Sequence, residues 1–260
     1  MQDAANYQYG NSDPAIQKGL PVGGYSNGPS SPYFIGNDYP EFDATEGNMY
    51  HKEDGSVVHF QSVFSVPNRY TYSDPEAPTF IVTYAQTQLL LAEAAVRGYV
   101  SGEAATYLEN GLRAACAQFS QFPAKGAANL VDTYLTADAV NAFVEGILAD
   151  FNAASNEGKM EIINTQYWVN SFGDEYEAFS NWRRSGYPQL KASPFCSGQG
   201  TYTFANGKTA TADGNSASNG IPRRFRYPTS EDQINTANYK EAVSRMNGGD
   251  RFDSRVWWDK

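Results

Sequence analysis

Histidine and cysteine are scarce in this sequence, which has two of each among its 260 residues. His51 and His59 are eight residues apart, whereas the i,i+4 spacing would place two imidazoles on one helical face as a metal-binding pair. The sequence also lacks a nucleophile elbow, a phosphate-binding glycine loop and a paired-cysteine metal motif. These absences predict a protein without a metal, a cofactor or an enzymatic activity.

The two cysteines could form one disulfide at most. Cys116 is in helical register with Leu108, Leu112 and Phe119, whereas Cys196 lies in a predicted loop. A buried helical thiol more often acts as a small hydrophobic side chain. The sequence leaves a disulfide between Cys116 and Cys196 open, and it does not indicate a redox compartment.

Basic residues are outnumbered, with 19 Lys and Arg against 29 Asp and Glu, for a formal net charge of -10. This charge repels polyphosphates and excludes nucleic acid as the expected partner. The one basic cluster is Arg223, Arg224 and Arg226. We expect these side chains to pair with carboxylates or to stack on Phe225 and Tyr227, in a structural role.

Long apolar runs are absent as well. No stretch approaches the roughly 18 to 20 consecutive apolar residues that a membrane-spanning helix needs. The first residues, Met1-Gln2-Asp3-Ala4, lack the basic start and the apolar stretch of a secretion signal. Either the protein is cytoplasmic or its N-terminal segment is missing.

The sequence pattern predicts a mainly α fold with long loops and minor β-hairpins, in one domain with three regions. These are a loop-rich region at 1–82, a helical region at 83–190, and a region of loops, a hairpin and a C-terminal helix at 191–260. In the first region, residues 1–50 are expected to be loop and 57–66 a strand. In the third, Asn206-Gly207 predicts a tight hairpin and 236–246 a helix.

The helical region begins with an expected helical hairpin over residues 83–119. Its Gly98 turn and its small residues are typical of a tetratricopeptide-like unit, in which two antiparallel helices approach closely. The predicted contacts are Leu90, Leu91 and Ala94 against Leu108 and Leu112. One such unit cannot bury its own apolar face, so a neighbouring helix pair is implied.

Three further helices are expected in this region. The first begins at the capping residue Thr136 and ends near Phe151. The other two, at 159–169 and 174–185, are separated by Ser171-Phe172-Gly173 and end at Gly186. Asp174, Glu175 and Glu177 are interpreted as solvated surface charges, because neighbouring helical carboxylates project in different directions.

Five blocks of the sequence carry a more specific signal. They are 84–95 (YAQTQLLLAEAA), 179–188 (FSNWRRSGYP), 221–228 (IPRRFRYP), the pair Asn238-Tyr239, and 255–259 (RVWWD). In this order they resemble the successive blocks of the SusD/RagB family. Within them, Trp182, Tyr187, Trp257 and Trp258 are expected to close helix ends and pack the core. Arg183, Arg184, Arg223 and Arg224 are expected to bind buried carboxylates and carbonyls.

The resemblance implies a tetratricopeptide-containing helical fold and a function at the cell surface of Bacteroidota. Members bind glycans or other nutrients and cap a SusC-like TonB-dependent transporter in the outer membrane. The chain is similar to the C-terminal portion of such a protein, so the lipid anchor is expected on a missing N-terminal part. The alternative is a tetratricopeptide-like scaffold whose concave helical face holds a peptide.

Tyrosine is abundant, with 18 residues in a chain that is 14% aromatic. Its ring has a flat apolar face and a polar tip, which suits a sugar ligand. Tyr25, Tyr33 and Tyr39 lie among Gly, Pro, Asn and Ser in a segment too polar to form a core. We predict that these three bind the ligand; the other interpretation is packing against the missing part or the transporter.

Overall fold

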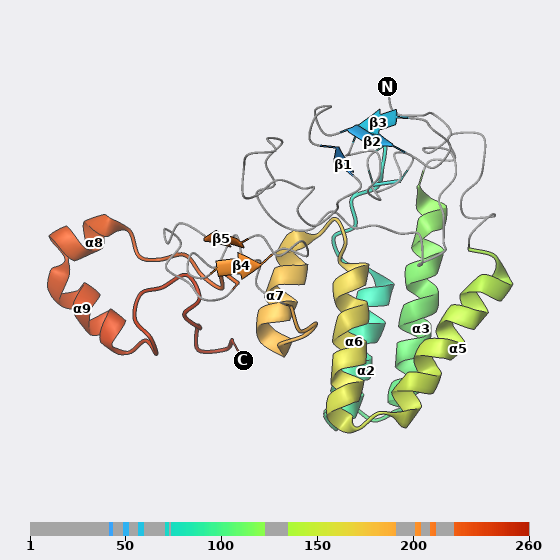
Figure 1. The fold of residues 1–260 in the computed structure, drawn as a ribbon. Coiled ribbons are helices and arrows are strands. Elements are labelled where there is room, and N and C mark those ends of the chain that lie inside the picture. The colour runs from blue at the N-terminus through green and yellow to red at the C-terminus, as the bar shows by residue number, and fades with distance from the viewer. Residues whose placement is uncertain are drawn as a thin grey trace. The chain divides into compact units, whose positions relative to one another are not determined.

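The computed structural model describes residues 71–72, 74–122, 135–190 and 221–259, together with the backbone of five short strands. The chain forms two compact units. One comprises Met1–Ile16, Val66–Gln189 and Lys260, and the other comprises Gln17–Ser65 and Leu190–Asp259. Each unit is described by itself (Figure 1).

The described part of the first unit is helical (Figure 1). Its elements are α2 (Tyr84–Val96), α3 (Ala104–Ala117), the 3-10 helix η4 (Gln118–Gln121), α5 (Ala137–Ala153), α6 (Asn156–Asn170) and α7 (Glu175–Ser185). Helix α2 packs against both α3 and α6, α3 against α5, and α6 against α7. The mainly α fold and the first helical hairpin are thereby confirmed, whereas the tetratricopeptide likeness stays a prediction.

Local capping signals set the helix ends. At the start of α2, Thr83 Oγ1 accepts a hydrogen bond from Gln86 N at 3.1 Å, and Gln86 Oε1 accepts one from Thr83 N at 2.9 Å. Thr136 and Ser155 cap α5 and α6 in the same way, each accepting from a backbone N–H three residues on. Gly186 ends α7 with a left-handed φ of 82°. These signals lie within one helical turn, so sequence inspection could find them.

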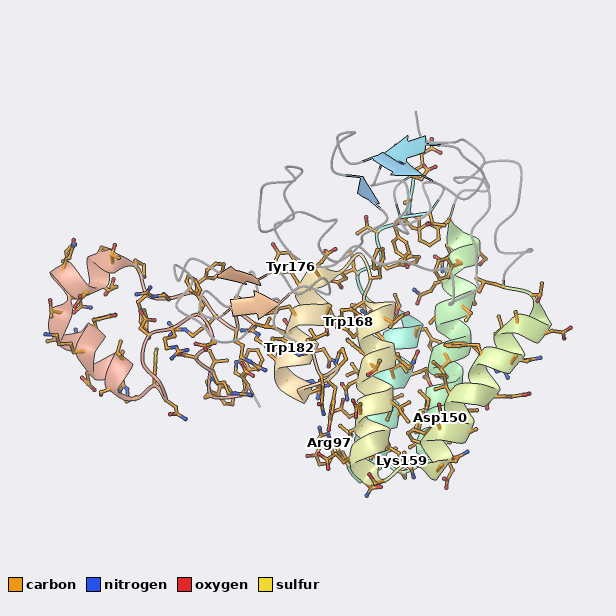
Figure 2. The ribbon with its side chains drawn as sticks, in the orientation of Figure 1. Arg97, Asp150, Lys159, Trp168, Tyr176 and Trp182 are labelled. Atoms are coloured by element: carbon orange, nitrogen blue, oxygen red, sulfur yellow. The ribbon has the colours of Figure 1, made fainter. Side chains whose placement is uncertain are left out.

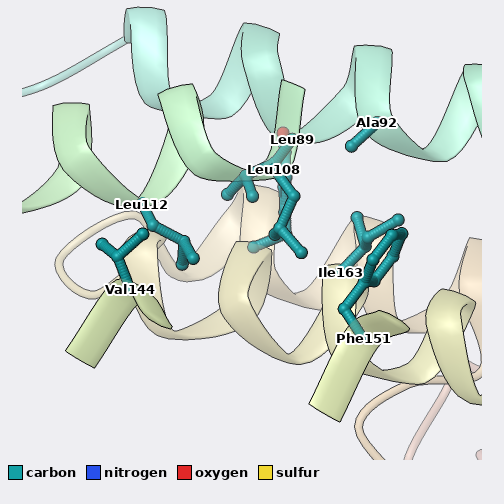
Figure 3. Packing of buried hydrophobic residues seen from close by; sticks show 8 residues of the cluster. Leu89, Ala92, Leu108, Leu112, Val144, Phe151 and Ile163 are labelled. Carbon is teal, nitrogen blue, oxygen red and sulfur yellow. The ribbon is translucent and has the colours of Figure 1, made fainter. Parts of the chain in front are cut away.

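Side chains from four helices form the core of this unit (Figure 3). Its buried members are Leu89 and Ala92 of α2, Leu108 and Leu112 of α3, Val144 and Phe151 of α5, and Ile163 and Tyr167 of α6. The two leucines of α3 thus occupy the core positions predicted for them. Each buried Leu or Phe side chain contributes about 1.5 to 3 kcal/mol through removal of apolar surface from water.

The predicted core face of α2 is wrong by one residue. Leu90 is 43% exposed, and Leu91 and Ala94 are only half-buried, whereas Leu89 is 1% exposed. The close approach of α3 decides this: a Cβ added to Gly111 would lie 2.9 Å from Leu89 Cγ. Three consecutive leucines could each have faced the core, and only the glycine on the neighbouring helix selects Leu89.

A buried polar network joins α2, α6 and α7. Glu93 of α2 accepts hydrogen bonds from both terminal nitrogens of Arg184 at 2.6 and 2.7 Å, and from Arg97 Nε at 2.8 Å. Arg184 also donates to Asn181 Oδ1 at 2.6 Å, and Asn181 Nδ2 donates to Asn164 Oδ1 of α6 at 3.0 Å. The network therefore fixes how the three helices are placed against one another.

The described strands belong to the second unit. Strands β1 (Phe42–Asp43), β2 (Met49–His51) and β3 (Val57–His59) form an antiparallel sheet in that order, and β4 (Thr201–Thr203) pairs with β5 (Thr209–Thr211). The loop predicted over 1–50 is thus wrong at β1 and β2, because strands of two or three residues are too short to show a period. The strand predicted at 57–66 is confirmed at Val57–His59, and 60–66 lie outside the described residues.

The predicted hairpin is confirmed in the pairing of its two strands, with Thr201 opposite Thr211 and Thr203 opposite Thr209, while the tight turn predicted at Asn206-Gly207 lies outside the described residues. Two helices follow, α8 (Thr229–Ile234) and α9 (Thr236–Ser244), which pack together. The sequence indicated α9 but not α8, whose single turn and a half is too short for a visible apolar stripe.

Two arginines of the cluster in the second unit, Arg223 and Arg224, have the structural role predicted for them. Arg223 forms an ion pair with the buried carboxylate of Asp259, and Arg224 pairs with Asp250 at 3.0 Å. The Arg224 guanidinium also lies over the ring of Tyr227, 5.0 Å from its centroid. These guanidinium groups therefore neutralise acidic side chains of their own unit.

The tryptophans do not all pack as predicted. Trp182 is buried, but Trp257 is 96% exposed, and Trp258 and Tyr187 are half-buried. In the terminal segment the buried side chain is Asp259, which Arg223 and Arg255 hold. In this segment the side chain that forms the ion pairs, Asp259, is buried, and the large apolar ring of Trp257 is not.

Replacing Leu89 by Ala is expected to lower the free energy of unfolding by about 2 to 5 kcal/mol, because it leaves a cavity in the core. Leu90→Ala on the same helix is the matched control and should change it by about 0.5 kcal/mol or less. Urea denaturation followed by circular dichroism measures both. Equal losses in the two variants would contradict the assigned face.

Glu93→Gln is expected to cost about 2 to 4 kcal/mol at neutral pH, less than a fully buried pair because the Arg184 side chain is 40% exposed. Burial alone would raise the pKa of Glu93, but the hydrogen bonds and charges of Arg184 and then Arg97 lower it to about 2, from an ordinary value of 4.5. The folded pKa is the lower one, so this stabilisation is complete above 4.5 and is lost as the pH falls towards 2.

Denaturation at a series of pH values from 7 to 3 measures this effect. The stability of the unchanged protein should fall more steeply below pH 4.5 than that of Glu93→Gln, whose residue 93 does not titrate. Glu109→Gln is the control, because the pair of Glu109 with Arg113 lies at the surface and should contribute about 1 kcal/mol or less. Identical slopes for Glu93→Gln and the unchanged protein would refute the role of Glu93.

Candidate functional site

The structure leaves the predicted ligand residues untested, because Tyr25, Tyr33 and Tyr39 lie outside the described residues. Within the described ranges, no three His, Cys, Asp or Glu side chains are grouped so that they could hold a metal. No helix there combines the length and apolarity needed to cross a bilayer. Cys116 is a free thiol whose pKa is raised by burial, and Cys196 lies outside the described residues.

A cavity of about 520 Å³ lies in the first unit where α2 begins, α6 ends and α7 begins. Tyr72 and the segment 74–80, which contains Phe80 and two prolines, supply one side of it. The first turn of α2 and the turn between α6 and α7 supply the rest. The volume is in the range of about 300 to 1,000 Å³ that is typical of small-molecule sites.

An aromatic cluster forms the apolar part of this cavity. The ring of Tyr72 meets those of Phe172 and Phe122 edge to face, with centroids 4.8 and 4.9 Å apart, and Phe119 lies 6.1 Å away. Phe80 joins the cluster through Phe122 at 5.8 Å. Burial raises the pKa of Tyr72, so its phenol stays protonated at neutral pH. Phe172 remains 54% exposed, which leaves ring surface for a ligand.

The turn between α6 and α7 holds Phe172 in place. Gly173 has a φ of 90°, which other residues rarely adopt, and a Cβ there would lie 3.4 Å from Tyr72 Cδ1. The backbone N–H of Asp174 donates to the carbonyl of Ser171 at 2.9 Å and closes the turn. The backbone of this short turn and the contact with the Tyr72 ring therefore hold the ring of Phe172 in position.

Polar groups line the same cavity. The side-chain nitrogen of Asn170 is buried and, among the described residues, has no hydrogen-bond partner. An unsatisfied buried donor costs about 1 to 3 kcal/mol, which a ligand acceptor would recover. Thr83 and Gln86 of the α2 capping box and the acidic residues Asp174 and Glu175 add further hydrogen-bonding groups.

The interpretation of the α7 carboxylates as solvated surface charges is wrong for two of them. Asp174 Oδ1 caps α7 by accepting from the N–H of Glu177 at 3.2 Å. Glu177 itself accepts from the hydroxyl of buried Tyr167 at 2.7 Å. Burial and this carboxylate raise the pKa of Tyr167. Glu177 thus has a structural role, and Glu175 remains exposed.

Sequence inspection missed Tyr72, Phe172 and Asn170 as ligand-site candidates. Their positions gave one usable signal: Phe172 stands in a glycine turn between two helices, where an apolar ring cannot be part of a helical core stripe. Tyr72 and Asn170 are about a hundred positions apart, and no local pattern connects them. The cavity becomes visible only once α2, α6 and α7 are packed together.

The SusD-like family, described as Susd and RagB outer membrane lipoprotein, matches residues 21–259. Among solved structures, a chitin-binding protein is 35% identical with a TM-score of 0.44, covering 68% of this chain and 32% of that one. A SusD-like protein of Bacteroidetes AC2a is 30% identical with a TM-score of 0.50, covering 69% and 30%. A SusD homologue of Bacteroides fragilis is 28% identical with a TM-score of 0.50, covering 70% and 35%.

The chain spans about a third of the length of these solved relatives. Among the curated proteins, no relative matches it.

Proposed function

Because this chain belongs to the SusD-like family of outer membrane lipoproteins, we propose that it is a nutrient-binding module of the cell surface and not an enzyme. Its proposed ligand is an oligosaccharide. The observation that carries this proposal is the cavity of about 520 Å³, where an exposed Phe172 ring occurs together with the buried Asn170 Nδ2, which has no hydrogen-bond partner among the described residues.

The chemistry of this cavity suits a sugar. A pyranose ring has apolar C–H faces and a rim of hydroxyl groups, so it needs flat apolar surface beside hydrogen-bonding groups. Tyr72, Phe80 and Phe172 supply the first, and Asn170 with Thr83 supplies part of the second. A hydroxyl oxygen that accepts from Asn170 Nδ2 would satisfy a donor that no group in the described part of the chain pairs with.

Replacing Phe172 by Ala is expected to weaken oligosaccharide binding about 5- to 30-fold, because the loss of a half-exposed ring removes about 1 to 2 kcal/mol of net contact. The change is measured by calorimetry of the 260-residue chain against a glycan panel. Phe143→Ala is the matched control, since this ring on α5 is 42% exposed and does not line the cavity. The Phe143→Ala variant should bind the oligosaccharide with unchanged affinity.

Two results would contradict the proposal at different levels. Sugar binding that survives Phe172→Ala would move the site away from this cavity. Binding of an extended peptide, with no sugar bound, would favour the alternative of a tetratricopeptide-like scaffold.

We retain Tyr25, Tyr33 and Tyr39 as proposed ligand contacts outside the described residues. The same titrations test them with each Tyr changed to Ala. Unchanged affinity in all three variants would exclude them and leave the cavity as the site.

We further propose that the protein acts with a SusC-like TonB-dependent transporter, as the C-terminal part of a lipid-anchored SusD-like protein. Affinity purification of the tagged protein from detergent-extracted outer membranes should yield a large TonB-dependent outer-membrane protein in equal amount. An anchored protein that elutes alone, even after cross-linking in intact cells, would contradict this partnership.

A further inference from the structure

We infer that Tyr167 and Glu177 are positioning residues for the ligand: the hydrogen bond between them holds the turn that carries Phe172 in place at the cavity. Tyr167 Oη, on α6, donates to Glu177 Oε1, on α7, at 2.7 Å. Neither residue is among those that line the cavity, so both would act on the ligand through other residues. This inference rests on the proposed function and deepens it, because it names residues outside the site that set the affinity of the site.

The segment between these two residues supplies one wall of the cavity. Its lining members are Asn170, Phe172, Gly173, Asp174 and Glu175. The segment has a pivot at Gly173, whose φ of 90° lies in the left-handed region that glycine adopts freely. A change of backbone angle at this glycine would move α6 and α7 relative to each other and would displace the Phe172 ring. A bond that joins the two helices close to the pivot opposes this movement.

Backbone hydrogen bonds close the turn only locally. The N–H of Ser171 donates to the carbonyl of Tyr167 at 3.0 Å, and the N–H of Asp174 donates to the carbonyl of Ser171 at 2.9 Å. Each of these bonds spans four positions or fewer, so neither joins one helix to the other. The bond from Tyr167 to Glu177 spans ten positions and ties the last turn of α6 to the first turn of α7.

The hydrophobic core fixes the donor end of this bond. Tyr167 is 3% exposed, and its ring belongs to the buried cluster that contains Leu89 and Ile163. The acceptor is a carboxylate, and hydrogen bonds to charged groups are about twice as strong as those between neutral groups. A second bond from α7 to α6, which Asn181 donates to Asn164 at 3.0 Å, lies one helical turn further from the cavity. The Tyr167 hydroxyl therefore constrains the turn more directly.

The consequence for binding comes from preorganisation. Side chains that already have the bound geometry lose little freedom when a ligand binds, whereas side chains that must first be ordered lower the affinity. Loss of the Tyr167–Glu177 bond should therefore weaken binding about 3- to 10-fold, although no ligand contact is removed.

Three variants test this bond without changing a residue that lines the cavity. Tyr167→Phe deletes the hydroxyl and keeps the ring in the core, and Glu177→Met deletes the acceptor on a side chain of similar length. Both should show the 3- to 10-fold loss, estimated at about 1 kcal/mol of ordering. Glu177→Gln keeps a side-chain oxygen that can accept the bond, and it should bind within about twofold of the unchanged chain.

Calorimetry of the 260-residue chain measures the affinities. The probes are the α- and β-linked glucose tetrasaccharides and the N-acetylglucosamine tetrasaccharide; any other glycan of the panel that binds serves in their place. Hydrogen exchange followed by NMR measures opening of the turn. Without ligand, the amides of Phe172 and Asp174 should exchange faster in Tyr167→Phe than in the unchanged chain, and a bound probe should slow them again.

Val144→Ala is the matched control for a loss of stability alone. It removes buried volume from the α5 part of the core and leaves the turn between α6 and α7 unchanged, so it lowers the free energy of unfolding without freeing the turn. It should alter neither the exchange of the Phe172 and Asp174 amides nor the affinity.

Affinity and turn exchange that are unchanged in Tyr167→Phe would overturn the inference and leave the proposed function intact. So would an equal loss of affinity in Val144→Ala, which would mean that binding follows overall stability. An equal loss in Glu177→Gln and Glu177→Met would also overturn it, because the charge of residue 177 would then act instead of its hydrogen bond. If no glycan of the panel binds at millimolar concentration, the proposed function fails, and the ligand role of the pair fails with it.

Discussion

The buried carboxylate of Glu93 imposes the constraint on which the helical unit depends. A carboxylate removed from water must be paired and hydrogen-bonded, or it destabilises the fold by several kcal/mol. Here Arg184 supplies the pair from a helix 91 positions away, and Asn181 and Asn164 complete the hydrogen bonding around the guanidinium. These bonds hold α2, α6 and α7 in the arrangement that also forms the cavity.

The cavity and the network lie at different levels of the same three helices. Glu93 and Arg184 are near the C-terminal ends of α2 and α7, while Thr83 and Asp174 cap the N-terminal ends of these helices at the cavity. Figure 2 shows Tyr176 near the start of α7 and Arg97, which donates to Glu93, at the opposite end of the helices. A ligand site formed by helix ends is as well ordered as the helices beneath it, so the network determines how rigidly Phe172 and Asn170 are presented.

The sequence blocks that resemble the SusD/RagB family have physical roles in this unit. The block at 84–95 contains Leu89 of the core and Glu93 of the network, and the block at 179–188 contains Asn181 and Arg184. These residues specify the packing, which is why they identify the fold. The cavity residues Tyr72, Asn170 and Phe172 lie outside both blocks, so the family signal says little about the ligand. Charge and shape at the cavity have to supply that information.

The sequence by itself determined the longer helices and several of their ends, such as the start of α5 at Thr136 and the end of α7 at Gly186, because a capping residue or a left-handed glycine acts within one helical turn. It also predicted that the arginine cluster is structural, since an acidic chain offers carboxylates throughout. Only the tertiary structure decided which of three leucines faces the core, because Gly111 of the neighbouring helix makes that choice. It alone also joined Glu93 to Arg184 and Tyr72 to Phe172, since contacts between residues so far apart in the chain exist only after the helices have packed.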